Sequence, residues 1–167
     1  MKTILGIDPG LASIGYGIIR FDGNRYHHIG HGVIRTSAAE EMGARLLKIH
    51  AGLEKVIAAF RPEEAAVETL YFAKNSKSAL PVSQARGVIL FTLAAHSVPC
   101  AEYTPHVLKQ AVIGRGRGEK RQVQELVKLV LGLPEIPAPD HAADALAVAI
   151  CHANHSGAEV KARTPEC

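Results

Sequence analysis

The order of the predicted strands and helices places this 167-residue chain in the α/β class, with a mixed five-stranded sheet and helices on both faces. Three strand-like segments come first, at residues 3–8, 13–20 and 27–34, and the short turns between them predict an antiparallel arrangement. Two further strand-like segments, 64–68 and 99–103, each follow a helical segment, which predicts that they complete a mixed sheet.

Five helices are expected from apolar spacing and from end signals. Apolar residues recur every three or four positions from about Ala38 to Phe60, which predicts an amphipathic helix that Arg61-Pro62 ends. The other helices are predicted at about 81–97, 104–113, 123–130 and 140–155. We expect one domain over residues 1–156, followed by a flexible tail over 157–167.

The composition is that of a folded globular protein. Hydrophobic residues make up 47% of the chain and charged residues 21%, which excludes an intrinsically disordered class. No apolar run approaches the roughly 18 residues that a transmembrane helix needs, so we expect no membrane association. The first residues lack a signal-peptide pattern, and we therefore expect a cytoplasmic protein.

Three acidic side chains and a histidine stand where two strands end and where the last helix begins. The first apolar run stops at Asp8 before the Pro9-Gly10 turn, and the fourth strand closes at Glu68. On the last helix, His141 and Asp144 are three residues apart and share a face. Open α/β sheets carry their chemistry at the carboxyl ends of strands. Clustered carboxylates favour Mg²⁺ or Mn²⁺, so the pattern predicts phosphodiester hydrolysis at a two-ion site.

Each of these residues also has an ordinary structural explanation. Asp8 could only shape the following turn, Glu68 could be a surface charge, and His141 could be a solvated residue of a first helical turn. We expect Asp140 to cap the last helix rather than to bind metal. The metal-site hypothesis therefore depends on the convergence of the group in space.

The middle of the chain is basic. Between Phe72 and Arg121 there are eight basic residues against two acidic ones, which favours a polyanionic partner, although solvated helix faces would give the same pattern. Tyr71 and Phe72 lie beside lysines, a combination that can stack on an unpaired base while holding phosphates. The candidate DNA-binding residues are Tyr71, Phe72, Lys74, Lys77, Arg86, Lys109, Arg115, Arg117, Lys120 and Arg121.

Ordered motifs along nearly the whole chain carry a resemblance to a known family. They are Leu5 to Gly10, Gly15-Tyr16-Gly17, Gly32 to Thr36, Val67-Glu68, Ala73-Lys74-Asn75, Gln84 to Gly87, Val107 to Gln110, Glu119-Lys120 and Ala142 to Ala147. This set resembles the RuvC family of bacterial Holliday junction resolvases. The resemblance implies an RNase H-like fold and a homodimer that nicks a four-way DNA junction symmetrically with Mg²⁺ or Mn²⁺, during recombination and repair. It also implies work with the RuvA and RuvB branch-migration proteins.

The resemblance places the catalytic and metal-binding roles on Asp8, Glu68, His141 and Asp144. The third of these positions is aspartate in some members of the family. Imidazole is a softer ligand than carboxylate, so His141 predicts a preference for Mn²⁺ over Mg²⁺. His141 could instead protonate the leaving oxygen or orient water. Lys109 and Lys120 look like DNA contacts near the active site, and the helix at 81–97 looks like the dimer interface.

Two other classes of function stay open at this point. A junction-binding protein without catalysis would share the basic segment, but the full acidic set argues against it. A phosphotransferase of the actin and sugar-kinase type shares the early Asp-x-Gly turn, yet it needs a second lobe for which this chain is too short. The leading prediction is a crossover junction endodeoxyribonuclease that leaves 5′-phosphate and 3′-hydroxyl ends.

Overall fold

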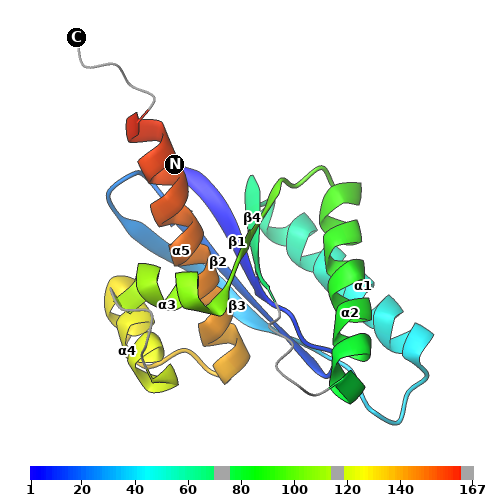
Figure 1. Ribbon diagram of the computed structural model, residues 1–167. Helices are drawn as coiled ribbons and strands as arrows, with labels where there is room; N and C mark the ends of the chain where they lie inside the picture. The colour runs from blue at the N-terminus through cyan, green and yellow to red at the C-terminus, as the bar shows by residue number, and fades with distance from the viewer. Residues whose placement is uncertain (70–75, 114–118, 163–167) are drawn as a thin grey trace.

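The computed structural model describes residues 1–69, 76–113 and 119–162, which form one mixed sheet and five helices (Figure 1). The strands are β1 (Lys2–Asp8), β2 (Ser13–Phe21), β3 (Tyr26–Arg35), β4 (Glu64–Glu68) and β5 (Cys100–Tyr103). The helices are α1 (Met42–Phe60), α2 (Ser76–Ala95), α3 (Pro105–Ile113), α4 (Lys120–Val130) and α5 (Asp140–Ala162). Among these described helices, each is too short or too polar to serve as a transmembrane span.

The sheet confirms the predicted fold class. Its strand order is β3-β2-β1-β4-β5, with antiparallel pairing among the first three strands and parallel pairing of β4 with β1 and β5. Ile7 is paired with Val67, so the next residues along the two parallel strands, Asp8 and Glu68, end at the same edge of the sheet.

Helices cover both faces of the sheet, as the sequence predicted. Leu5 and Ile7 of β1 pack under α1 and α2, whereas Ile4 faces α4 and α5. Figure 1 shows α1 and α2 on one side and α3, α4 and α5 on the other. Since side chains alternate along a strand, Asp8 shares the α5 face with Ile4 and Gly6.

Glycines on β1 and β2 let the α5 backbone lie directly on the sheet. A Cβ atom at Gly6 would stand 2.0 Å from the Ala145 carbonyl oxygen, and one at Gly15 would stand 1.9 Å from the His141 carbonyl oxygen. Neither side chain would fit without moving the helix. These two close approaches set the height of α5 above the strand that carries Asp8.

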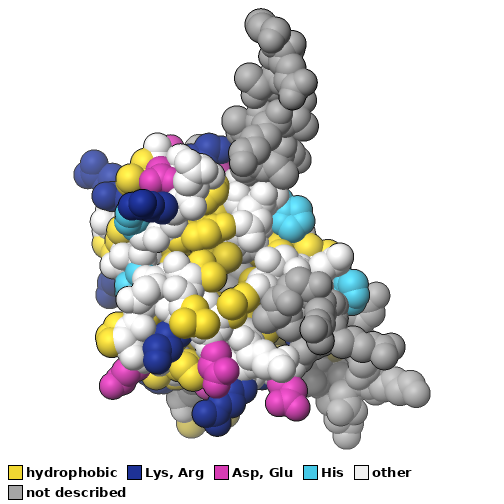
Figure 2. Space-filling model, turned by 90° about the vertical axis from the view of Figure 1, so that its left-hand side faces the viewer, with side chains coloured by type: hydrophobic (Ala, Val, Ile, Leu, Met, Phe, Trp, Pro, Cys, Tyr) yellow, Lys and Arg dark blue, Asp and Glu magenta, His cyan; other side chains and the backbone are white. Residues whose placement is uncertain are grey.

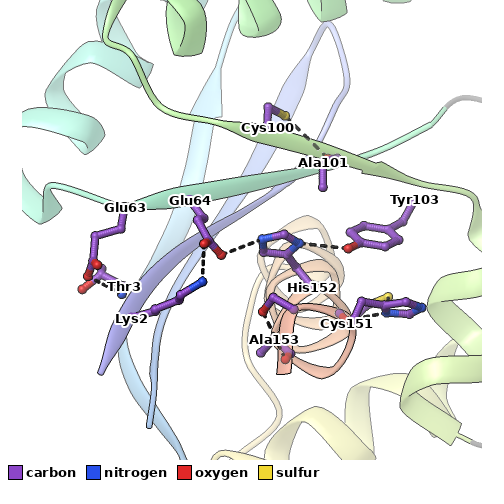
Figure 3. Close-up of polar contacts among 12 residues, drawn as sticks. Lys2, Thr3, Glu63, Glu64, Cys100, Ala101, Tyr103, Cys151, His152 and Ala153 are labelled. Carbon is purple, nitrogen blue, oxygen red and sulfur yellow. Dashed lines mark hydrogen bonds and ion pairs between the residues drawn. The ribbon is translucent and has the colours of Figure 1, made fainter. Parts of the chain in front are cut away.

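A buried polar network fixes the middle of α5 to the opposite end of the sheet (Figure 3). The His152 ring contacts the Glu64 carboxylate through Nε2 at 3.1 Å and the Tyr103 hydroxyl through Nδ1 at 2.9 Å. Lys2 forms an ion pair with the same glutamate at 2.5 Å. The network therefore joins β1, β4, β5 and α5, and His152 is only 9% exposed.

Several helix boundaries differ from those predicted, three of them by four residues or more. The segment before Met42 forms a turn in which the Ser37 carbonyl accepts from the Glu40 N–H. The Ser37 hydroxyl accepts from the Ala39 N–H, since a serine side chain competes with the helix for backbone partners. Helix α2 begins at Ser76 and carries Pro81 inside it; the proline ring has a helical φ, but its position costs the helix one backbone hydrogen bond. Helix α5 continues to Ala162, beyond the predicted end near His155.

Candidate active site

Asp8 and His141 are in direct contact, although they are far apart in the chain. The Asp8 Oδ2 atom lies 2.6 Å from His141 Nδ1. Asp8 is the last residue of β1, and His141 lies in the first turn of α5 directly above it. The Asp8 side chain is 14% exposed and the His141 side chain 47% exposed, so the pair lies at the molecular surface, at one edge of the sheet.

Asp144 completes a compact set of potential metal ligands. One ligand atom from each of Asp8, His141 and Asp144 lies within 4.8 Å of the other two. His141 and Asp144 are brought to the same face because they are three residues apart on α5. Two carboxylates and an imidazole are donors that Mn²⁺ and Mg²⁺ accept, so the residues present fit a divalent ion.

Glu68 stands beside this set rather than inside it. It is the last residue of β4 and lines a cavity together with Asp144. Burial, with the nearby charges of Asp8 and Asp144, raises the pKa of Glu68 to about 7. The sequence predicted four converging groups; the structure gathers three closely and places Glu68 near enough for strong electrostatic coupling.

Burial also raises the pKa of Asp8, with a further contribution from the charge of Asp144. The hydrogen bond from His141 and the charge of Lys120 oppose that increase. The Asp8 carboxyl thus holds its proton more tightly than an isolated one does. Such an arrangement is stabilised by a cation, which is why it is a poor structural element and a good ion site.

Lys120, the first residue of α4, supplies a positive charge to the same place. Its Nζ atom lies 2.9 Å from Asp144 Oδ2 and 3.3 Å from Asp140 Oδ2. Burial acts to lower the pKa of Lys120, but bonds and charges of Asp144 and Asp140 more than offset this and raise it. Asp140 was predicted to cap the helix; instead it is the first residue of α5, and its carboxylate pairs with Lys120.

A cavity of about 270 Å³ opens next to the carboxylates between α3, α4 and α5. Lys109 and Lys120 line it together with Glu68 and Asp144. Its remaining walls are apolar and were not predicted, because residues of this kind look like ordinary helix-packing positions: Pro105, Leu108, Val123 and Ala147. The cavity thus combines acidic, basic and apolar walls, which suits a phosphate backbone held beside metal ligands.

Comparison with known proteins agrees with this geometry. A family model described as crossover junction endodeoxyribonuclease RuvC matches residues 4–152. The chain belongs to the RuvC family. A relative of that name from Treponema denticola is 56% identical over 90% of this chain and 85% of its own length. One from Desulforamulus reducens is 53% identical over 92% of this chain and 94% of its own length.

Solved structures agree as well. Thermus thermophilus RuvC in complex with a Holliday junction substrate has a TM-score of 0.91 and 36% identity, over 95% of this chain and 97% of that one. The yeast mitochondrial Holliday junction resolvase Ydc2, at 14% identity and a TM-score of 0.69, shares the fold. The predicted family, fold class and enzyme class, a crossover junction endodeoxyribonuclease, are thereby confirmed.

The predicted DNA-binding residues of this RuvC family member fall into three groups. Lys109 and Lys120 line the cavity. Arg86 of α2 pairs with Glu102, and Arg121 of α4 lies 3.1 Å from Glu125. Figure 2 shows basic and acidic side chains next to each other along the lower edge of one face of the molecule. Outside the described residues lie Tyr71, Phe72, Lys74, Arg115, Arg117 and the side chain of Lys77.

Proposed function

We propose that this RuvC family member resolves four-way DNA junctions with a divalent-metal site built from Asp8, Glu68, His141 and Asp144. The observation that carries the proposal is the compact set formed by Asp8, His141 and Asp144 beside the cavity that holds Glu68. Such a set accounts for the family's phosphodiester hydrolysis without any further catalytic group. A bound ion would supply a Lewis acid that stabilises charge on the phosphate oxygens and lowers the pKa of water.

Each residue of the site has a distinct task in this scheme. Asp8 and Asp144 would hold the ions, because each offers a carboxylate oxygen to the compact ligand set. Glu68, with a pKa of about 7, can accept the proton of the attacking water at a carboxylate oxygen at neutral pH. The water oxygen would then bond to phosphorus as the bond to the 3′-oxygen breaks, and the leaving 3′-oxygen would take a proton from solvent water, which leaves 5′-phosphate and 3′-hydroxyl ends.

His141 sets the metal preference that we propose. Its Nδ1 atom contacts Asp8, which fixes the ring orientation and leaves Nε2 as the nitrogen that completes the donor set. An imidazole favours Mn²⁺ over Mg²⁺, so we propose faster cleavage with Mn²⁺. We propose two ions per site because a pair would stabilise both the attacking and the leaving oxygen. Equal or faster cleavage in saturating Mg²⁺ would contradict this preference.

The DNA contacts are proposed in order of their support. Lys109 and Lys120 stand in the cavity wall and would hold the scissile phosphate. We retain the other predicted contacts as proposals from the sequence alone: Tyr71, Phe72, Lys74, Lys77, Arg86, Arg115, Arg117 and Arg121. Binding through such residues should weaken steeply with salt.

A homodimer is proposed from an exposed stripe on α2. Leu80, Gln84, Gly87 and Phe91 follow one another at spacings of four, three and four, and all are exposed. The Leu80 and Phe91 side chains are 68% and 65% exposed, which is unusual for large apolar groups without a partner. Pairing through this stripe would present two active sites to one junction for symmetric nicks. Family membership supports cooperation with RuvA and RuvB and a cytoplasmic location.

The dimer proposal is tested by sedimentation and by counting nicks per junction. Phe91→Glu should give monomers that cut the two strands independently, whereas Leu129→Glu, at an equally exposed leucine of α4, should leave the dimer intact. Dimers and paired nicks in the Phe91→Glu protein would overturn this interface.

The catalytic proposal is tested with a labelled four-way junction and a linear duplex of the same sequence. The wild type should cleave the junction only when a divalent ion, Mn²⁺ or Mg²⁺, is present, and Asp8→Asn should bind the junction but lose cleavage by about 1,000-fold or more. Asp22→Asn, in the exposed β2–β3 turn, is the control and should cleave normally. Binding without any product in the wild type would favour the non-catalytic junction binder, and retained cleavage by Asp8→Asn would remove Asp8 from the mechanism.

A further inference from the structure

The Lys120 ammonium is shared by two carboxylates on successive turns of α5. It lies 2.9 Å from Asp144 and 3.3 Å from Asp140. The two acceptors differ in surroundings: the Asp144 side chain is 24% exposed and the Asp140 side chain 69%. Asp144 also belongs to the compact set of metal ligands, and Asp140 does not. One cation therefore spans a ligand of the site and a carboxylate just outside it.

This sharing creates a conflict at Asp144. The Asp144 carboxylate accepts from Lys120 through Oδ2 and also belongs to the proposed ion site. An ammonium and a divalent ion repel each other, so an ion bound at Asp144 acts against the contact between Lys120 and that carboxylate. The contact between Lys120 and Asp144 must therefore weaken when an ion binds there. The positive charge of Lys120 is nevertheless required in the cavity wall, where we propose that it holds phosphate.

We propose that Asp140 is a positioning residue that retains the Lys120 ammonium at the rim of the site when a divalent ion occupies Asp144. The proposal rests on the function proposed above and adds a role to a residue outside the catalytic set. Because Asp140 is already 3.3 Å from Nζ, the transfer requires only a small rotation of the exposed lysine side chain. Asp140 thus resolves the competition without sending Lys120 into solvent.

Removal of Asp140 should make metal binding harder. Without it, Asp144 becomes the only one of these two carboxylates available to Lys120, and the ammonium competes more strongly with the ion. Asp140→Asn should therefore weaken Mn²⁺ binding, by about threefold for a partly exposed pair. A simple loss of negative charge near the site would also weaken binding, so a single variant is not enough.

A double-mutant cycle separates the two explanations. The affinity of the DNA-free protein for Mn²⁺ is measured by the electron paramagnetic resonance of free Mn²⁺ in the wild type, Asp140→Asn, Lys120→Met and the double variant. Lys120→Met should bind Mn²⁺ more tightly than the wild type. In that background Asp140→Asn should have no further effect, since the competing ammonium is gone. Glu125→Gln, an exposed carboxylate of α4, is the matched charge control and should bind Mn²⁺ as the wild type does.

The outcomes are distinguishable from those of the catalytic proposal. An equal weakening by Asp140→Asn in both backgrounds would show that only its charge acts and would overturn this inference, as would no weakening in either. If the wild type did not bind Mn²⁺, and Asp8→Asn made no difference to that result, both the ion site and this inference would be refuted. Circular dichroism of each variant checks that the fold is retained.

Discussion

The two ends of strand β4 carry the same residue in opposite electrostatic settings. Glu64 begins the strand and contacts His152 and Lys2, whereas Glu68 ends it beside Asp8 and Asp144. Burial opposes ionisation at Glu64, but Lys2 and His152 outweigh it and lower the pKa. At Glu68, burial and two like charges act together and raise the pKa to about 7.

The difference separates a structural site from a functional one. Each end pairs a strand carboxylate with a histidine of α5: Glu64 with His152, and Asp8 with His141. The Glu64 end is balanced within the protein by Lys2 and by the Tyr103 hydroxyl (Figure 3). The other end holds more acid than its bases neutralise, so it gains from an external cation. We therefore expect mutations at the two ends to have opposite effects on stability.

The largest effect is expected where the backbone contact holds the functional end together. In Gly15→Ala the new methyl group would overlap the His141 carbonyl, which must shift the first turn of α5 away from Asp8. We expect a loss of cleavage of about 100-fold, because a displacement of about 1 Å is enough for that. Junction cleavage rates measure it. Gly43→Ala, where a Cβ meets nothing within 4 Å, is the control, and equal activity of the two variants would refute the contact's role.

Glu68→Gln should stabilise the metal-free protein while abolishing efficient cleavage. The pKa of Glu68 is raised, so its ionisation costs stability as the pH rises from the ordinary value of 4.5 through about 7. The variant should therefore gain at most about 3 kcal/mol at pH 8 and nothing near pH 4. Urea unfolding in a chelator at both pH values checks this. A destabilised variant at pH 8 would mean that Glu68 is paired rather than repelled.

Glu64→Gln should have the opposite sign. The pKa of Glu64 is lowered, so its contribution to stability is present above the ordinary value of 4.5 and disappears as the pH falls below it. We expect a loss of about 1–2 kcal/mol at pH 7, because the substitution removes a partly exposed ion pair with Lys2 and the charged acceptor that His152 contacts. The same unfolding experiment measures it, and cleavage at 25 °C should stay close to the wild type. A large loss of cleavage by the fully folded Glu64→Gln protein would show that the Glu64 end of the sheet also takes part in function.

Tyr103→Phe should produce the smallest effect. The variant removes the hydroxyl that contacts His152 and keeps the ring in place. A single hydrogen bond contributes about 1 kcal/mol, so the unfolding midpoint should fall slightly and cleavage should be unchanged. If Tyr103→Phe changed the Mn²⁺ concentration needed for half-maximal cleavage, the two ends would be energetically coupled, and the distinction between a structural and a functional end would be wrong.

The sequence predicted the functional end better than the structural one. Asp8 could be found because an apolar run stops there before Pro9-Gly10, and His141 with Asp144 because their spacing places them on one helix face. The contact between His152 and Glu64 leaves no such trace, since 88 positions separate the two residues and each looks ordinary in its own element. Local spacing reveals which residues share a face, but partners across elements depend on packing.

The same limit explains the errors near the site. Asp140 was expected to cap a helix because it follows Pro139, and only the approach of α4 to α5 reveals Lys120 as its partner. The separation of Glu68 from the compact trio likewise depends on how β4 and α5 pack, which spacing does not encode. The dimer, the metal preference and the DNA contacts stay predictions.

The central claim is that one divalent-ion site forms between β1 and α5 at the acidic end of the sheet. Crystals of the wild-type protein soaked in Mn²⁺, with diffraction recorded at the manganese absorption edge, test it most directly. The account predicts an anomalous peak bounded by Asp8, His141 and Asp144. An ordered site without any such peak, or a peak held by other residues, would contradict it.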